Sequence, residues 1–212
     1  MAYFHTFINT LDGWLASAYD EDDVWVQKRA KDSPNDIELV LRPETTPGTY
    51  LWLRKKLDEG RGCKPPICAW QIGKSFRREQ DQPYKHMRLK EFHQMEFQCL
   101  YAADTKNDYH AAMIELVRRM IAEVVGLPTR AIPSDRLPAY SQVTIDIEAD
   151  TGVNTDGKWL ELCSISRRTD FPGTWKLDGK NGPKEIELLV LEIAIGIDRC
   201  VFAKEKAVST MR

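Results

Sequence analysis

Two long segments in the middle of the chain alternate apolar and polar residues with a period of two. They run from Ile67 to Arg78 and from Arg88 to Tyr101, and the polar stretch EQDQPYK separates them. This alternation is typical of β-strands with one apolar face, and a short polar break between two such strands predicts a hairpin. The chain is therefore expected to contain a long antiparallel strand pair, from which a larger sheet continues.

Further helices and strands are indicated on both sides of this hairpin. Apolar residues recur at helical spacing in four segments: Tyr3 to Ala18, Thr45 to Leu57, Asp104 to Val125 and Gly196 to Ala207. Short apolar or alternating runs predict five strands: Val24 to Gln27, Ile37 to Leu41, Gln142 to Glu148, Trp159 to Ile165 and Glu185 to Ile193. Because many of these strands follow one another without an intervening helix, the predicted fold class is α+β, a mainly antiparallel β-sheet flanked by helices.

The composition indicates one domain with a balanced charge. Its 212 residues are 42% hydrophobic, which is enough for one substantial core. With a formal net charge of -2, any contact with nucleic acid has to be local. We see neither a secretory leader nor a membrane span, and five cysteines, with Cys63 and Cys68 as the only close pair, fit reduced thiols. We therefore expect a cytoplasmic protein.

One face of the predicted hairpin carries chemistry suited to a nucleotide. Arg77 and Glu79 share a face of the first strand, and Arg88, Phe92 and Glu96 share a face of the second. A guanidinium pairs with phosphate, a flat ring stacks on a base, and a carboxylate accepts hydrogen bonds from an amino or ammonium group. A solvated outer face is the alternative, but the order of these residue types favours a site for a purine nucleotide.

Four sequence motifs extend from the segment before the hairpin to near the end of the chain. They are LRPETTPGTY at Leu41 to Tyr50, FRRE at Phe76 to Glu79 with RLKEFHQME at Arg88 to Glu96, SISRRTDF at Ser164 to Phe171, and EIAIGIDR at Glu192 to Arg199. In this order they resemble the LRPETAQG segment, motif 2, the GIADRTDF segment and motif 3 of class II aminoacyl-tRNA synthetases, most closely those of glycyl-tRNA synthetases. The resemblance covers residues 41–203 of one predicted catalytic domain, residues 1–212, and leaves residues 1–40 unassigned.

The resemblance implies an ATP site on the hairpin. Arg77 would bind the α-phosphate, Glu79 would read the adenine amino group, and Phe92 would stack on adenine. Arg199 would contact the γ-phosphate, which makes Arg77 and Arg199 the implied catalytic pair. The full set of residues implied to bind ATP is Arg77, Glu79, Arg88, Phe92, Arg168 and Arg199.

The resemblance also implies a pocket for a small amino acid. Its residues would be Glu44, Glu96, Gln98, Glu192 and Ala194. The glutamates match family residues around the substrate ammonium group. However, Gln98 stands in place of a glutamate and Ala194 in place of a serine, which is expected to shift substrate selection because buried polar contacts discriminate strongly.

Two further departures lie in the third motif. Ser164 replaces a glycine of the family pattern, and Arg167 replaces an acidic residue. We expect this exchange to alter the approach to the acceptor.

The implied function is that of a ligase. The enzyme would activate glycine or a similar small amino acid to an aminoacyl-adenylate, release pyrophosphate, and transfer the aminoacyl group to an acceptor, most readily tRNA. ATP and Mg²⁺ would be required; the metal ligands are unassigned, with Glu185 and Glu187 as candidates. Lys85 and His86, in the hairpin loop, would contact the acceptor end.

The chain lacks two other features of the family. Only thirteen residues follow Arg199, so we expect no anticodon-binding domain, and no clear motif 1 is present, although a homodimer is the family expectation. Two alternatives stay open: aminoacylation of a carrier protein, nucleotide or small molecule, and a catalytically silent synthetase paralogue that acts as a binding or regulatory subunit. The persistence of Arg77, Glu79, Phe92, Arg168 and Arg199 favours an enzyme.

Overall fold

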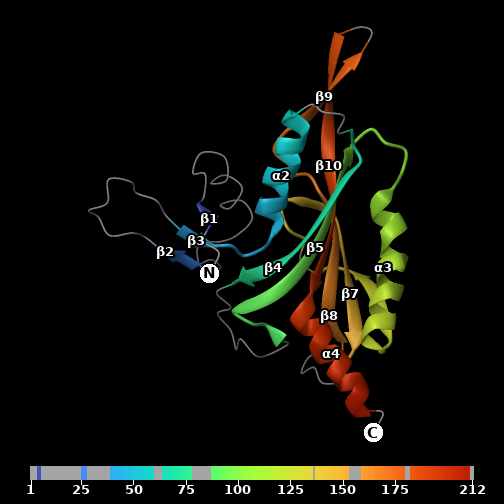
Figure 1. Cartoon of the computed structure of the whole chain (residues 1–212). Helices are drawn as coiled ribbons and strands as arrows, with labels where there is room; N and C mark the ends of the chain where they lie inside the picture. The colour runs from blue at the N-terminus through green and yellow to red at the C-terminus, as the bar shows by residue number, and fades with distance from the viewer. Residues whose placement is uncertain are drawn as a thin grey trace, which may run out of the picture.

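An antiparallel sheet of seven strands forms the centre of the molecule (Figure 1). The computed structural model describes residues 4–5, 25–27, 39–59, 64–77, 87–135, 137–152, 159–179 and 182–210. The strand order is β4-β5-β10-β8-β7-β6, and β9 pairs with the first half of β10. The strands are β4 (Ile67–Phe76), β5 (Glu91–Ala102), β6 (Thr129–Pro133), β7 (Ser141–Asp150), β8 (Trp159–Arg168), β9 (Thr174–Gly179) and β10 (Gly182–Gly196).

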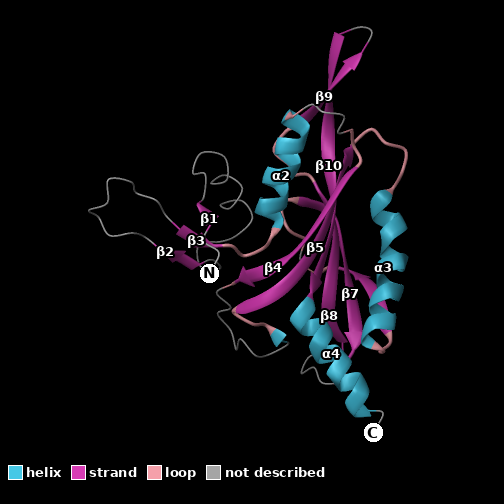
Figure 2. Ribbon diagram, viewed as in Figure 1, coloured by secondary structure: helices cyan, strands magenta, loops and turns pink. Residues whose placement is uncertain are grey.

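Helices cover both faces of this sheet (Figure 2). Helix α2 (Thr46–Asp58) contacts β4 and β5 on one face. Helices α3 (Tyr109–Val125) and α4 (Ile197–Thr210) lie on the opposite face, where α3 contacts β6, β7 and β8, and α4 contacts β5, β8 and β10. None of the described helices is long and apolar enough to span a lipid bilayer.

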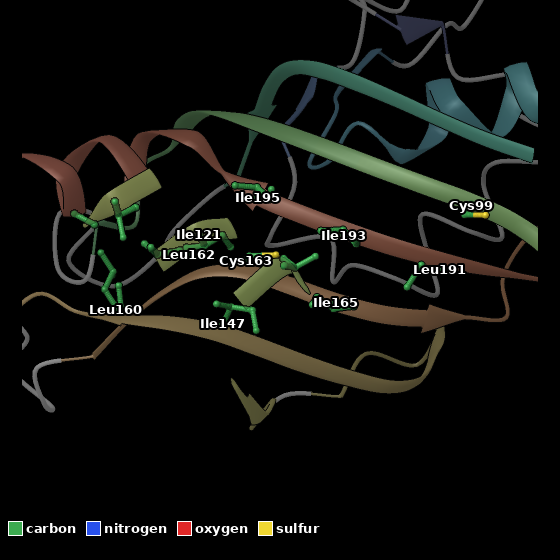
Figure 3. Close-up of a cluster of buried hydrophobic side chains, with 14 of the residues drawn as sticks. Cys99, Ile121, Ile147, Leu160, Leu162, Cys163, Ile165, Leu191, Ile193 and Ile195 are labelled. Carbon is green, nitrogen blue, oxygen red and sulfur yellow. The ribbon is translucent and has the colours of Figure 1, made fainter. Parts of the chain in front are cut away.

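The larger hydrophobic core lies between the sheet and helices α3 and α4 (Figure 3). It is built from alternate residues of neighbouring strands, such as Ile147, Ile165 and Ile193, because directly opposed residues in antiparallel strands point to the same face. A smaller core around Tyr50 and Leu53 lies under α2. On the α2 face, the parts of β5 and β10 outside the smaller core carry polar side chains, such as Glu96, Gln98 and Glu192.

Helix α3 shows why the local sequence begins and ends a helix where it does. Asp108 is the N-cap, and its side chain accepts a hydrogen bond from the backbone N–H of Ala111 at 3.0 Å. Gly126 ends the helix with φ at 75°, a left-handed conformation that glycine adopts without a steric penalty.

Most predicted elements are confirmed. The hairpin is β4 and β5, and the other predicted helices and strands correspond to α2, α3, α4, β2 (Trp25–Gln27), β3 (Leu39–Leu41), β7, β8 and β10. The sequence-based prediction missed β6 and β9, which are short. The predicted helix from Tyr3 to Ala18 lies largely outside the described residues, and it was wrong at β1 (Phe4–His5), which pairs with β3.

Candidate active site

The strand register places the predicted amino-acid pocket in two neighbouring rows across the sheet. Each row takes one residue from each of β5, β10, β8 and β7, and opposed residues share a face. One row is Glu96, Ala194, Ser164 and Asp146, and the next is Gln98, Glu192, Ser166 and Thr144. Residues that are far apart in sequence therefore meet on the face of the sheet that carries α2.

The LRPET segment, residues 41–45, is held on this face by contacts with the edge strand β4. Arg42 crosses β4 at Gly73, where a Cβ atom would lie 2.1 Å from the Arg42 guanidinium, so a larger residue would require the arginine side chain to shift. The Arg42 Nε donates to the Lys74 carbonyl at 2.7 Å, and the backbone N–H of Phe76 donates to the Arg42 carbonyl at 2.9 Å. This anchor holds Glu44 and Thr46 over the two rows.

A cavity of about 470 Å³ opens beside the rows. Its lining combines cationic and aromatic side chains with hydroxyl and carboxyl groups. The first kind are Arg77, Arg88, Phe92, His93 and Arg199, and the second are Ser134, Asp135, Tyr140, Thr144, Asp146, Glu161, Ser164 and Ser166. This mixture suits a ligand with an anionic part and a polar or cationic part.

The arginines of the cavity come from three places: Arg77 directly follows β4, Arg88 precedes β5, and Arg199 lies at the start of α4. The Arg77 guanidinium lies 5.2 Å from the centre of the Phe92 ring, and its Nε donates to the Pro43 carbonyl at 3.2 Å. Arg199 donates to the Glu161 carbonyl at 2.9 Å and pairs with its carboxylate at 3.3 Å. The two arginines reach the cavity from separate elements.

Three buried glutamates lie next to the cavity, around one arginine. Glu44, Glu96 and Glu192 are each less than 5% exposed, and the Arg168 side chain among them is completely buried. Arg168 Nη1 donates to Glu192 at 2.6 Å and to Glu44 at 3.2 Å. We call these four residues the acidic cluster; its carboxyl groups outnumber its guanidinium.

Thr45, Thr46 and Gln98 form hydrogen bonds with or beside the carboxyl groups of the acidic cluster. The Thr46 hydroxyl lies 3.0 Å from both Glu96 and Glu192, and the Gln98 amide donates to Thr46 at 3.0 Å. The backbone N–H of Thr45 donates to Glu96 at 3.2 Å. Charge-assisted contacts of this kind fix the carboxylates in place.

The surplus of negative charge changes the protonation of the cluster. Burial raises the pKa of Glu96 to about 8, and repulsion from Glu192 and Glu44 adds to the rise. Burial also raises the pKa of Glu192, against the opposing effect of Arg168. A cationic group placed beside these carboxylates would offset their repulsion, so the cluster has the electrostatic character of a site for ammonium.

Comparisons with known proteins identify the family of the chain. The family model described as tRNA synthetase class II core domain (G, H, P, S and T) matches residues 25–205. The chain belongs to this family. Members of the class II family in general use ATP and Mg²⁺.

Curated relatives of this class II chain are glycine–tRNA ligases. The ligase of Mycolicibacterium paratuberculosis is 34% identical over 136 residues, which is 62% of this chain and 29% of the relative. That of Mycoplasmopsis synoviae is 28% identical over 178 residues, 78% of this chain and 38% of the relative. That of Cutibacterium acnes is 33% identical over 135 residues, 62% and 28%. The class II chain thus spans about a third of the length of these relatives.

The structure brings most of the predicted site residues of the class II core together. Arg77, Arg88, Phe92, Arg199 and Ala194 line the cavity. The predicted residues that form or contact the acidic cluster are Glu44, Glu96, Gln98 and Glu192. Glu79, Lys85 and His86 lie outside the described residues.

Arg168 occupies a different environment from the one expected for a phosphate contact. Its side chain is completely buried, and it donates to the Asp170 carboxylate at 2.7 and 3.0 Å. The Tyr140 ring lies 4.0 Å from the guanidinium. Arg168 thus neutralises part of the charge of the buried carboxylates, and its predicted contact with phosphate or adenylate stays a prediction.

Arg167 also differs from its expectation. It points to the α3 side of the sheet, where its guanidinium contacts Asp108 at 2.6 Å. Since Asp108 caps α3, Arg167 contributes to helix capping, and the expectation that it alters the approach to the acceptor is not supported by its placement.

Ser164 lies directly opposite Ala194, in the row that also holds Glu96. The hydroxyl that the family pattern places on β10 is therefore matched by a hydroxyl on the neighbouring strand β8, and both residues line the cavity. Gln98 is completely buried, and among the described residues its side-chain oxygen has no hydrogen-bond donor.

Sequence reasoning missed several residues of the site. Thr144, Asp146 and Tyr140 line the cavity but belong to none of the quoted motifs. Burial raises the pKa of Asp146 to about 6, and repulsion from Glu161 contributes. The signal that could have found them is the period-two pattern of polar residues in Gln142 to Glu148, read against the same pattern in Ser164 to Arg168.

The candidate metal ligands do not reach the cavity. Glu185 and Glu187 are exposed on the first half of β10, and Glu185 lies 3.8 Å from Lys176 of β9. Within the described ranges, no group of three or more histidine, cysteine, aspartate or glutamate side chains is arranged to hold a metal ion. The carboxylates that do face the cavity from neighbouring strands are Asp146 and Glu161.

The raised pKa of Glu96 predicts how stability depends on pH. Folded Glu96 keeps its proton up to about pH 8, whereas the unfolded chain loses it near its ordinary value of 4.5. The folded state then binds more protons between these values, so this group lowers stability as the pH rises from about 5 to 8. Urea unfolding at pH 6 and pH 9 should show the loss in the parent chain and a smaller loss in Glu96→Gln. Equal losses in both chains would contradict the assignment.

Proposed function

We propose that this class II core domain uses ATP to activate glycine, or an amino acid of similar size, and transfers it to tRNA. One observation supports this most strongly. The acidic cluster, which suits an ammonium group, adjoins a cavity that is lined by Arg77, Arg88, Arg199 and Phe92. Residues 41–203 are proposed to form the catalytic core.

In the proposed complex each part of the substrates meets a matching group. The ammonium group of the amino acid lies beside Glu96 and Glu192, where it offsets their repulsion. Ala194 and Ser164 line the cavity in the same row as Glu96. Selection of a small substrate is then proposed to follow from the buried polar contacts around its ammonium group.

The arginines are proposed to hold the triphosphate. Arg77 binds the α-phosphate, Arg88 supports the bent chain, and Arg199 binds the γ-phosphate from the α4 side. A substrate carboxylate oxygen attacks the α-phosphorus, a phosphorus–oxygen bond forms, and the bond to pyrophosphate breaks. Positioning of two anions and neutralisation of charge supply most of the rate enhancement in such a reaction, so no general base is required.

Asp146 and Glu161 are the cavity carboxylates that would hold Mg²⁺, which takes one or two protein carboxylates at such sites and would supply charge neutralisation at the phosphates.

Phe92 is proposed to stack on adenine. Phe92→Ala is expected to weaken ATP binding by about 1 to 3 kcal/mol, the range found when an aromatic platform under a base is removed. Calorimetric titration with ATP and Mg²⁺ measures this loss. An unchanged dissociation constant would count against the stacking role.

The cellular setting and assembly are also proposals. We propose a cytoplasmic homodimer. The edge strand β4 supports an interface, since Trp70 and Ile72 on it are 68% and 56% exposed, and such apolar surface is typical of subunit contacts. Sedimentation of the full chain tests the dimer, and a monomer at micromolar concentration would contradict it.

Binding of the non-hydrolysable sulfamoyl analogue of glycyl-adenylate tests the proposed function. Because the analogue spans the cavity and the acidic cluster, it should bind at least about tenfold more tightly than AMP and than the leucyl analogue. Equal affinity for all three compounds would contradict the proposal that the cavity and the acidic cluster form one binding site. Charging of total tRNA with labelled glycine then tests the acceptor, and adenylate formation without charging would indicate a non-tRNA acceptor.

A further inference from the structure

Two cysteines lie directly opposite each other on β4 and β5. Cys68 pairs with Cys99 in the strand register, both are free thiols, and their Sγ atoms are 2.9 Å apart. Opposed residues in an antiparallel pair have Cα atoms about 4.5 to 5.5 Å apart. This spacing lies within the range of about 4.4 to 6.8 Å that a disulfide spans. A bond between the two sulfurs therefore requires no shift of either strand.

We propose that Cys68 and Cys99 form an oxidative modification site, where a two-electron oxidant such as hydrogen peroxide converts the two thiols into a cross-strand disulfide. The pair is unrelated to the chemistry of the cavity. Cys99 follows Gln98 on β5, and successive residues of a strand point to opposite faces. The proposal therefore does not depend on the proposed function.

The two thiols differ in access, and this difference sets the order of the reaction. Cys68 is exposed, whereas Cys99 is only 5% exposed and belongs to the core between the sheet and helix α3 (Figure 3). Burial raises the pKa of Cys99 to about 12, and the contact with Cys68 adds to the rise. Cys68 is therefore the thiol that meets the oxidant first.

The reaction balances in two steps. The Cys68 thiolate attacks one oxygen of the peroxide, the O–O bond breaks, and the protein gains a sulfenic acid while hydroxide leaves and takes up a proton to become water. The Cys99 sulfur then attacks the Cys68 sulfur, its proton goes to the departing hydroxide, and a second water forms. Two thiols are oxidised and one peroxide is reduced.

The other described cysteines are protected from this reaction. Cys163 is buried in the core, and burial raises its pKa well above the ordinary value. Cys200 on α4 is partly buried, and burial raises its pKa to about 11. Oxidation should therefore be selective for the Cys68–Cys99 pair.

The disulfide would join the edge strand of the sheet covalently to its neighbour. Because it closes the loop that contains the whole hairpin, it restricts the unfolded chain, and the oxidised protein is expected to melt about 5 to 10 °C higher than the reduced protein. Dithiothreitol should reverse this shift.

Peptide mapping of the native chain tests the proposal. The full chain is treated with hydrogen peroxide, alkylated and digested, and we expect a peptide pair that joins Cys68 to Cys99 with the loss of two hydrogen atoms. The exposed-site variant Cys68→Ser should remove both the link and the melting shift, whereas Cys200→Ser should keep both. Over-oxidised Cys68 with unreacted Cys99, or a link from Cys68 to Cys63, would overturn the proposal.

Discussion

Replacing Arg168 with methionine is expected to lower the free energy of unfolding by about 3 to 5 kcal/mol at pH 7. The change keeps much of the side-chain volume but removes the buried guanidinium that contacts Glu44 and Glu192. Removing one partner of a buried ion pair leaves its counterpart charged and without compensation, which costs more than the pair itself contributes. Here Glu192 loses its contact of 2.6 Å and Glu44 its contact of 3.2 Å.

Urea unfolding of the parent and Arg168→Met chains measures this loss. The matched control is Arg119→Met, because Arg119 is exposed on α3, where an ion pair contributes at most about 1 kcal/mol. The loss for Arg168→Met should shrink at pH 5, since the orphaned glutamates can then take up protons. A loss of less than about 1 kcal/mol at pH 7 would show that the acidic cluster does not need its arginine.

The second large effect concerns catalysis rather than stability. Arg77→Ala is expected to slow adenylate formation by about 10²- to 10³-fold, the usual cost of removing one group that stabilises charge in the transition state. The fold should persist, because Arg77 is only partly buried at the end of β4 and its side chain contacts Phe92 and the Pro43 carbonyl.

Single-turnover formation of the adenylate gives the rate, and circular dichroism checks the fold. Arg119→Ala is the matched control, since Arg119 is exposed on α3, on the face of the sheet opposite the cavity. Near-parental rates in Arg77→Ala would remove this arginine from the proposed mechanism.

The hairpin shows how far local pattern predicts this fold. Period-two alternation identified β4 and β5, and motif spacing identified the residues of the cavity edge. Register was not accessible in the same way, because it depends on how the loop between the strands closes, and a slip of one residue would move every side chain to the other face. For that reason the pairing of Cys68 with Cys99 could not be predicted; Cys63, the cysteine nearest to Cys68 in sequence, lies outside the described residues.

Arg168 illustrates the second limit. A motif match names the residue but not its surroundings, which come from the LRPET segment and from β10, far away in sequence. Only the assembled sheet shows that the guanidinium contacts Glu44 and Glu192. Asp146 was missed for the opposite reason, because its strand carries no motif, although register places it in the same row as Glu96.

The most direct test of the central claim is exchange of labelled pyrophosphate into ATP, measured with each of the twenty amino acids in turn. Our account predicts exchange that depends on glycine or on another amino acid of similar size, and that is lost in Arg77→Ala. Exchange with a large amino acid alone would contradict the pocket, and no exchange with any amino acid, from a folded chain that binds ATP, would contradict the proposed activation.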